Sequence, residues 1–156
     1  MQAMQRGALA AGTVRPFAAR AAPARRRAAA AARAAADRPI ELHVGDTTVA
    51  FPLRRDQTAA LAAAVAGVMR TFAEKAEAAR PKRWDSMEFK AEGDGSAGEV
   101  ELLEVVCNPN MAPTAFDARV LVTLRAGGVR LTTEGKLSAL KADVEVHVDA
   151  LRQAAR

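Results

Sequence analysis

The sequence predicts a single α+β domain: an antiparallel β-sheet of about five to six strands, with a long helix and a C-terminal helix packed on one face. Two observations predict this class. Segments in which apolar and polar residues alternate lie on both sides of an alanine-rich segment that ends at Arg80 and has helical spacing of its apolar residues. With the C-terminal segment, they give the order β-β-α-β-β-β-β-α. A chain of 156 residues, half of them hydrophobic, is long enough for one such domain and too short for two.

The first 38 residues differ in composition from the rest. They contain eight Arg, no Lys and one Asp, a net charge of +7, whereas residues 39–156 carry 15 Lys plus Arg against 17 Asp plus Glu, a net charge of −2. Seventeen alanines interrupted by arginines are typical of an organellar transit peptide and leave no continuous apolar region for a secretory signal. We therefore expect a transit peptide over residues 1–38 and the folded domain over 39–156.

The Ala and Arg bias of this leader, with Val14-Arg15-Pro16-Phe17 near its start, resembles the plastid precursors of green algae. The resemblance implies a chloroplast stromal protein, with the mitochondrial matrix as the alternative. A nucleic-acid-binding arm is a third interpretation, but it would be more natural on a domain that was itself basic. A single Cys fits a reducing compartment. No run of residues is long and apolar enough for a membrane helix, so we expect a soluble protein or one attached at most to a membrane surface.

The first segment of the predicted domain is a hairpin. Apolar and polar residues alternate over 40–44 and over 49–53, and Gly45-Asp46 supplies a two-residue turn. Pro52 should lie at the edge or end of its strand because it cannot donate a backbone hydrogen bond.

A helix is predicted next, with Asp56 as its N-cap and with good helix formers as far as Arg80, before Pro81 ends it. Its apolar residues fall at helical spacing and predict the face that packs on the sheet: Leu61, Val65, Val68, Met69 and Phe72.

Strands resume after Trp84. Residues 87–91 alternate, and "GDGSAG" is a loop followed by a strand, which argues against a phosphate-binding loop because such loops open a helix. A strand apolar on both faces then ends at Cys107. A second hairpin over 116–136 turns at Gly127-Gly128. This turn pairs three sets of outer-face residues: Arg125 with Arg130, Thr123 with Thr132, and Arg119 with Lys136. Residues 138–155 suit either a helix or a strand; we favour a helix capped by Ser138.

Groups that could carry chemistry are sparse. His43 lies on a predicted solvent face, and His147 has Asp149 two residues on but no nucleophile nearby in sequence. Cys107 ends a buried strand, with no base or helix N-terminus beside it to lower its pKa. No pattern of metal ligands occurs in the sequence. We therefore predict no cofactor, no metal and no catalytic residue.

Two basic features are the predicted partner-binding residues. The outer face of the second hairpin gathers Arg119, Arg125, Arg130 and Lys136, and like charges directly opposite on a sheet favour a partner that neutralises them. The segment "RPKRW" joins Lys82 and Arg83 to Trp84, the only tryptophan, although a Trp that opens a strand is more often part of the core. Met111, which we expect to be exposed in the loop "CNPNMAPTAF", is a further candidate.

These observations predict a small non-catalytic stromal factor that binds a protein partner with an acidic surface and serves the assembly, stability or regulation of a photosynthetic complex. Nucleic acid is a less favoured partner, because the aromatics that would stack on bases fall on predicted buried faces: Phe51, Phe72, Phe89 and Phe116. An organellar RNA- or ribosome-associated protein is the first alternative. An enzyme that uses Cys107 or His147 is the second.

Overall fold

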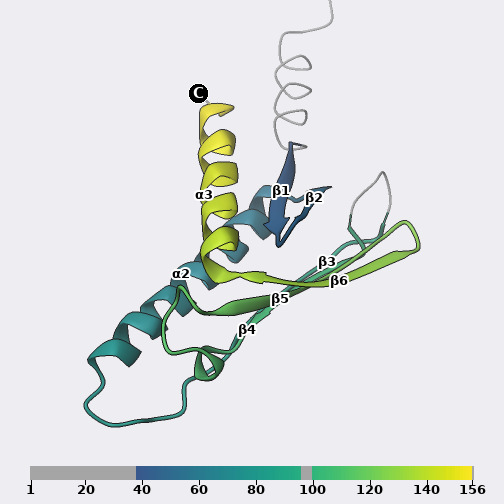
Figure 1. The fold of residues 1–156 in the computed structure, drawn as a ribbon. Helices are drawn as coiled ribbons and strands as arrows, with labels where there is room; N and C mark the ends of the chain where they lie inside the picture. Colours follow the sequence, from purple (N-terminus) through teal and green to yellow (C-terminus); the bar gives the residue numbers. More distant parts are fainter. Residues whose placement is uncertain (1–37, 96–99, 156) are drawn as a thin grey trace, which may run out of the picture.

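The computed structural model describes residues 38–95 and 100–155, so the predicted transit peptide lies outside the described residues apart from Arg38. The α+β class and the predicted order of elements are confirmed (Figure 1), with one short 3-10 helix added. The elements in chain order are β1 (Pro39–Val44), β2 (Thr47–Pro52), α2 (Arg55–Glu77), β3 (Met87–Glu92), β4 (Leu102–Cys107), η2 (Pro109–Met111), β5 (Arg119–Ala126), β6 (Val129–Lys136) and α3 (Leu137–Gln153).

The six strands form two antiparallel sheets instead of the single sheet that the sequence suggested. β1 and β2 pair only with each other, and the other strands form a sheet in the order β3-β4-β5-β6. The β1–β2 hairpin contacts α3 and β6 without joining the larger sheet. Alternation shows that a strand has one buried face, but it does not show which strand will be its neighbour.

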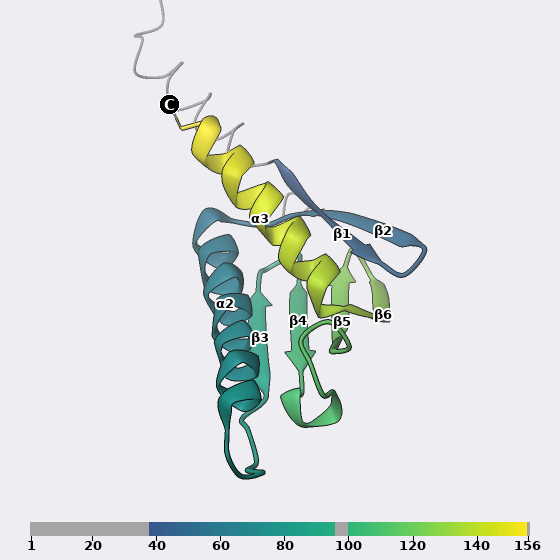
Figure 2. The same cartoon turned by 60° about the vertical axis from the view of Figure 1, so that its left-hand side comes forward.

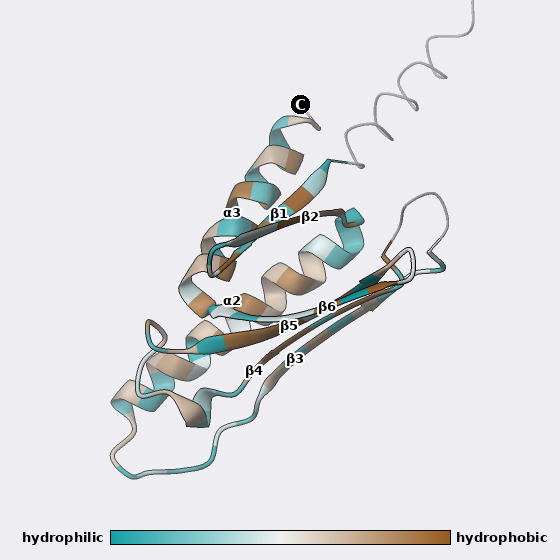
Figure 3. Cartoon of the chain, turned by 45° about the vertical axis from the view of Figure 1, so that its right-hand side comes forward, coloured by the Kyte–Doolittle hydropathy of each residue, from teal (hydrophilic) through white to brown (hydrophobic). Residues whose placement is uncertain are grey.

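Both helices and the β1–β2 hairpin lie on the same face of the four-stranded sheet (Figures 1 and 3). The core fills the space between these layers. The predicted stripe of α2 faces it, with Leu61, Val65, Val68 and Phe72 buried and Met69 partly buried. Each such side chain contributes about 1.5–3 kcal/mol when it is fully buried. No described element covers the opposite face of the sheet, which we call the open face.

One glycine sets the distance between the hairpin and the sheet. Gly135 lies near the end of β6 where β1 passes, and a Cβ atom there would lie 2.8 Å from Cγ1 of Val44. Only a residue without a side chain lets the two strands approach this closely. The packing of the hairpin on the sheet therefore depends on this position.

The predicted helix ends need correction. Asp56 is not the N-cap of α2: Arg54 is, and the side chain of Gln57 accepts a hydrogen bond from its backbone N–H at 3.2 Å. Asp56 lies in the first turn instead, where a hydrogen bond from the Arg54 side chain lowers its pKa. The helix ends at Glu77, three residues before Arg80, and Arg80 itself precedes Pro81, a position that disfavours the helical conformation.

The C-terminal segment is a helix, as favoured, but Lys136 and not Ser138 precedes its first residue. The predicted register of the second hairpin is confirmed in all three pairs. Gly127 and Gly128 both have positive φ, as the two-residue turn requires. No helix in the described part of the chain has the length and apolarity needed to cross a membrane.

Phe116 is a further correction. The sequence placed it on the buried face of the second hairpin, whereas β5 begins at Arg119 and the Phe116 side chain is 80% exposed. Residues 115–117 form a turn, in which Asp117 accepts a hydrogen bond from the Thr114 hydroxyl at 2.6 Å. This local side-chain hydrogen bond competes with strand pairing and holds the phenylalanine outside the sheet.

Candidate functional site

Two asparagines fix the loop between β4 and β5 to the segment that precedes β3. The Asn108 side chain accepts hydrogen bonds from the backbone N–H and the side-chain amide of Asn110, at 3.0 and 2.9 Å. Asn110 in turn accepts from the Trp84 N–H at 2.9 Å and donates to the Trp84 carbonyl at 2.7 Å. The Asn110 side chain thus pairs with the N–H and the carbonyl of Trp84, as the backbone of a neighbouring strand would. It joins the loop to the segment that enters β3.

A lysine from α2 fixes the same loop from the other side. Lys75 lies in the last turn of the helix, and its ammonium group donates to the carbonyls of Pro109 and Ala112, at 2.8 and 2.6 Å. It also lies 5.8 Å from the centroid of the Phe72 ring. Hydrogen bonds from a charged donor are stronger than neutral ones. The loop backbone is therefore tied to α2 as well as to Trp84.

Two large apolar side chains project from this fixed loop. Met111 is 83% exposed and Phe116 is 80% exposed, the two highest values among the exposed large hydrophobic side chains of the described chain. The exposure expected for Met111 is confirmed, and that of Phe116 was not expected. Polar groups hold the loop backbone while its large apolar groups face solvent. A loop that only connects two strands would instead expose polar side chains and bury its large apolar ones.

The "RPKRW" segment lies beside this loop, but it does not present its tryptophan. Trp84 is buried, and its backbone is held by Asn110. The Lys82 ammonium lies 3.8 Å from the centroid of the indole ring, a short cation–π contact. Lys82 and Arg83 are exposed. The tryptophan therefore belongs to the edge of the core, and only the three cations of this segment, Arg80 among them, are open to a partner.

The four basic residues of the second hairpin do not form one cluster. They form two cross-strand pairs, Arg119 with Lys136 and Arg125 with Arg130. Six residues separate the pairs along β5, a distance of about 20 Å. Arg119 also lies 3.5 Å from a Glu134 carboxylate, an exposed pair that contributes little to stability. Only the first pair is near the loop, because β5 begins where the loop ends.

These features meet at one end of the sheet, where both the connection from α2 to β3 and the loop from β4 to β5 lie (Figure 2). We call this region the loop-end surface. It has two apolar residues and four cations: Met111, Phe116, Lys82, Arg83, Arg119 and Lys136. Apolar anchors with a charged rim are the usual composition of a protein-binding patch.

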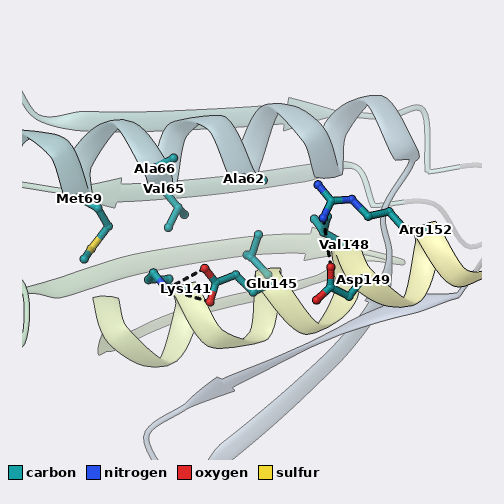
Figure 4. Close-up of a pocket in the computed structure, with 10 residues that line it drawn as sticks. Ala62, Val65, Ala66, Met69, Lys141, Glu145, Val148, Asp149 and Arg152 are labelled. Carbon is teal, nitrogen blue, oxygen red and sulfur yellow. Dashed lines mark hydrogen bonds and ion pairs between the residues drawn. The ribbon is translucent and has the colours of Figure 1, made fainter.

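A groove with a volume of about 590 Å³ lies between α2 and α3 (Figure 4). Its apolar lining comes from both helices, and two ion pairs of α3 lie beside it, Lys141 with Glu145 at 2.7 Å and Arg152 with Asp149 at 3.2 Å. The sequence does not predict this groove, because whether two helices leave a gap between them depends on how they cross. The groove is lined by Ala62, Val65, Ala66, Met69, Val144 and Val148 along with those charged residues.

The two histidines lie beside one hollow, although they are 104 positions apart in the sequence. Both line a hollow of about 190 Å³ between β1 and α3. His43 is exposed, as predicted, and Asp143 accepts hydrogen bonds from its backbone N–H at 2.6 Å and from its Nδ1 at 2.9 Å. His147 is only 5% exposed, and its Nε2 has no hydrogen-bond partner among the described residues. Burial, and to a lesser extent the charge of Arg38, lowers the pKa of His147.

Cys107 is buried, and burial raises the pKa of its thiol, so little of the reactive thiolate forms at neutral pH. Within the described ranges, no three His, Cys, Asp or Glu side chains are placed to hold a metal ion.

The fold and these contacts define the class of molecule: an α+β domain with an open sheet face and a fixed, apolar-tipped loop at one end. No protein-family model matches the chain, and neither does any curated protein or solved structure.

Proposed function

We propose that this protein is a non-catalytic protein-binding factor of the plastid stroma, which acts in the assembly, stability or regulation of a photosynthetic complex. One observation carries the binding role: Met111 is displayed on a segment whose backbone is tied down through Asn110 and Lys75, and Phe116 is displayed on the following turn, which the hydrogen bond from Thr114 to Asp117 holds. The composition of the first 38 residues supports the location.

The energetics favour a partner at the loop-end surface. Burying Met111 or Phe116 in a partner contributes about 1.5–3 kcal/mol for each side chain. The hydrogen bonds made by Asn110 and Lys75 reduce the backbone freedom that residues 108–112 lose on binding, so more of this energy appears as affinity. The cations of the rim add long-range attraction toward an acidic partner and mainly raise the association rate.

An affinity capture from chloroplast stroma tests this proposal. The immobilised protein is compared with a Met111→Asp/Phe116→Asp variant, which puts charge where the partner would bury apolar surface. Val146→Asp is the matched control, because Val146 is 71% exposed on α3, away from the loop. We expect the wild type and the control to retain the same stromal protein and the double variant to lose it. Equal retention by all three forms would contradict the proposal.

The RNA alternative gains one observation from the structure, since Phe116 is exposed only three residues before Arg119. An aromatic beside a cation can stack on an unpaired base. The same capture separates the two cases when the stroma is treated with ribonuclease beforehand. Loss of the captured protein after treatment would indicate that RNA, and not a protein surface, is the partner.

A further inference from the structure

The open face of the four-stranded sheet is divided by charge. The half formed by β3 and β4 has a net charge of −2, and the half formed by β5 and β6 has a net charge of +3. The first half presents Glu88, Lys90, Glu92 and Glu104, and the second presents Arg119, Arg125, Arg130, Lys136 and Glu134. One face of one domain thus carries both an acidic and a basic surface.

Apolar side chains lie between the two halves. Leu121 on β5 is 46% exposed, and its cross-strand neighbour is Val106 on β4, which is partly buried. Leu102, at the other end of β4, is also partly buried on this face. The central strands therefore offer a short apolar strip along the boundary between the acidic and basic halves.

One row across the sheet ends in two adjacent arginines, which line a hollow together with Glu101. The register places Leu102 beside Arg125 and Arg125 beside Arg130, with Glu92 at the far edge on β3. The two guanidinium groups are direct cross-strand neighbours, an arrangement that destabilises a sheet. Within the described residues, neither forms an ion pair with a carboxylate. A partner with carboxylates in a matching row would relieve this repulsion.

We infer that the partner of the open face is a second copy of this chain, packed face to face about a two-fold axis parallel to the strands. This axis places β3 of one protomer over β6 of its partner and β4 over β5. The acidic half of each protomer then meets the basic half of the other, and the apolar strips meet in the centre. In the row of the two arginines, Glu92 of each protomer lies over Arg130 of the other, whereas the row of Leu121 places Glu88 over Glu134. An axis across the strands would instead place each half over itself and oppose like charges. Two-fold pairing of one self-complementary patch is the commonest form of homodimer.

The size of the face predicts a weak dimer. Four strands about 4.8 Å apart, each about six residues long at 3.4 Å per residue, give a contact plane of about 20 by 20 Å, or roughly 400 Å² for each protomer. Stable complexes bury about 800 Å² for each partner. Dimerisation should therefore be concentration-dependent, and it should weaken at high salt because its complementarity is electrostatic.

Two charge-reversal variants of the full chain test the inference by sedimentation equilibrium at low salt. Arg125→Glu/Arg130→Glu reverses the basic half, and Glu92→Lys/Glu104→Lys reverses the acidic half. Each variant alone should self-associate roughly tenfold more weakly than the wild type, because each opposes like charges at both symmetry-related contacts. An equimolar mixture should form heterodimers at least as readily as the wild type forms homodimers, since both contacts then join opposite charges.

The control is Arg55→Glu/Arg70→Glu, which changes the net charge by the same amount as Arg125→Glu/Arg130→Glu but at two exposed positions on α2. It should dimerise like the wild type, and circular dichroism should show all variants folded. A wild type that stays monomeric at every concentration, or a mixture that stays monomeric, would overturn the inference. The altered residues lie outside the loop-end surface, so failure here leaves the stromal capture experiment unaffected.

Discussion

Gly135 provides the sharpest test of the packing between the hairpin and the sheet. In a Gly135→Ala variant the new methyl carbon would lie 2.8 Å from Val44 Cγ1, 3.5 Å from Val44 Cα and 3.6 Å from Val44 Cβ. Carbon atoms normally rest about 3.5–4.0 Å apart, so only the Cγ1 contact is too short, by roughly 0.7–1.2 Å. The backbone of Gly135 does not have a positive φ, so the contact and not the conformation causes the strain.

The expected loss of stability follows from two opposing effects. Overpacking of this kind costs about 1–3 kcal/mol. Replacing glycine by alanine within a strand returns about 0.5–1 kcal/mol, because the unfolded chain loses freedom. The net loss should be about 1–2 kcal/mol, or roughly 4–8 °C in Tm for a domain of this size. Thermal and urea unfolding followed by circular dichroism measure it.

The Val44→Ala background tests the cause. Without Cγ1 the contact is gone, so Gly135→Ala should there be neutral or stabilise the fold by about 0.5 kcal/mol. Gly67→Ala is the matched control, since a Cβ at that helical position would meet nothing within 4 Å and alanine is the better helix former. An equal loss from Gly135→Ala in both backgrounds would refute the proposed contact with Val44.

Two further predictions concern buried polar groups. The lowered pKa of His147 means that the unfolded chain binds more protons below the ordinary value of 6.5, so stability should fall as the pH drops below that value. His147→Leu should remove this loss of stability at low pH. At neutral pH the variant should be as stable as the wild type or about 1 kcal/mol more stable, because Nε2 has no hydrogen-bond partner to lose. Equal pH profiles of stability for the variant and the wild type would exclude His147 as the cause. Lys75→Met should destabilise the domain by about 2 kcal/mol and speed hydrogen exchange in the β4–β5 loop above all. Lys141→Met, which removes only an exposed ion pair, is the control, and a uniform increase in exchange would argue against a loop-specific role.

The elements that local patterns encode could be predicted from the sequence. The period-two alternation and Gly127-Gly128 gave the second hairpin with its full register, and the apolar spacing gave the packed face of α2. The register of the hairpin and the packed face of the helix both depend on residues that lie close together in the sequence, within adjacent strands or a few helical turns. The ends of the helices were harder to predict from the sequence. At the start of α2, for example, Gln57 makes the capping hydrogen bond that we had expected from Asp56.

The contacts that build the loop-end surface could not be predicted, because they join distant residues. Asn110 reaches Trp84 across 26 positions, and Lys75 reaches Pro109 across 34. No periodic pattern records such pairs. The exposure of Phe116 did have a local signal, the hydrogen bond between Thr114 and Asp117, which the apparent alternation of the following strand obscured. The meeting of His43 with Asp143, 100 residues apart, is equally non-local.

Photo-crosslinking in chloroplast stroma tests the central claim most directly, namely that the fixed loop is the binding surface. A photoreactive phenylalanine analogue replaces Phe116 in one preparation and Val146 in the other; both positions are more than two-thirds exposed. Irradiation should give one dominant protein adduct from position 116 and none of the same mass from position 146. The same adduct from both positions, or no protein adduct from position 116, would contradict a partner held by Met111 and Phe116.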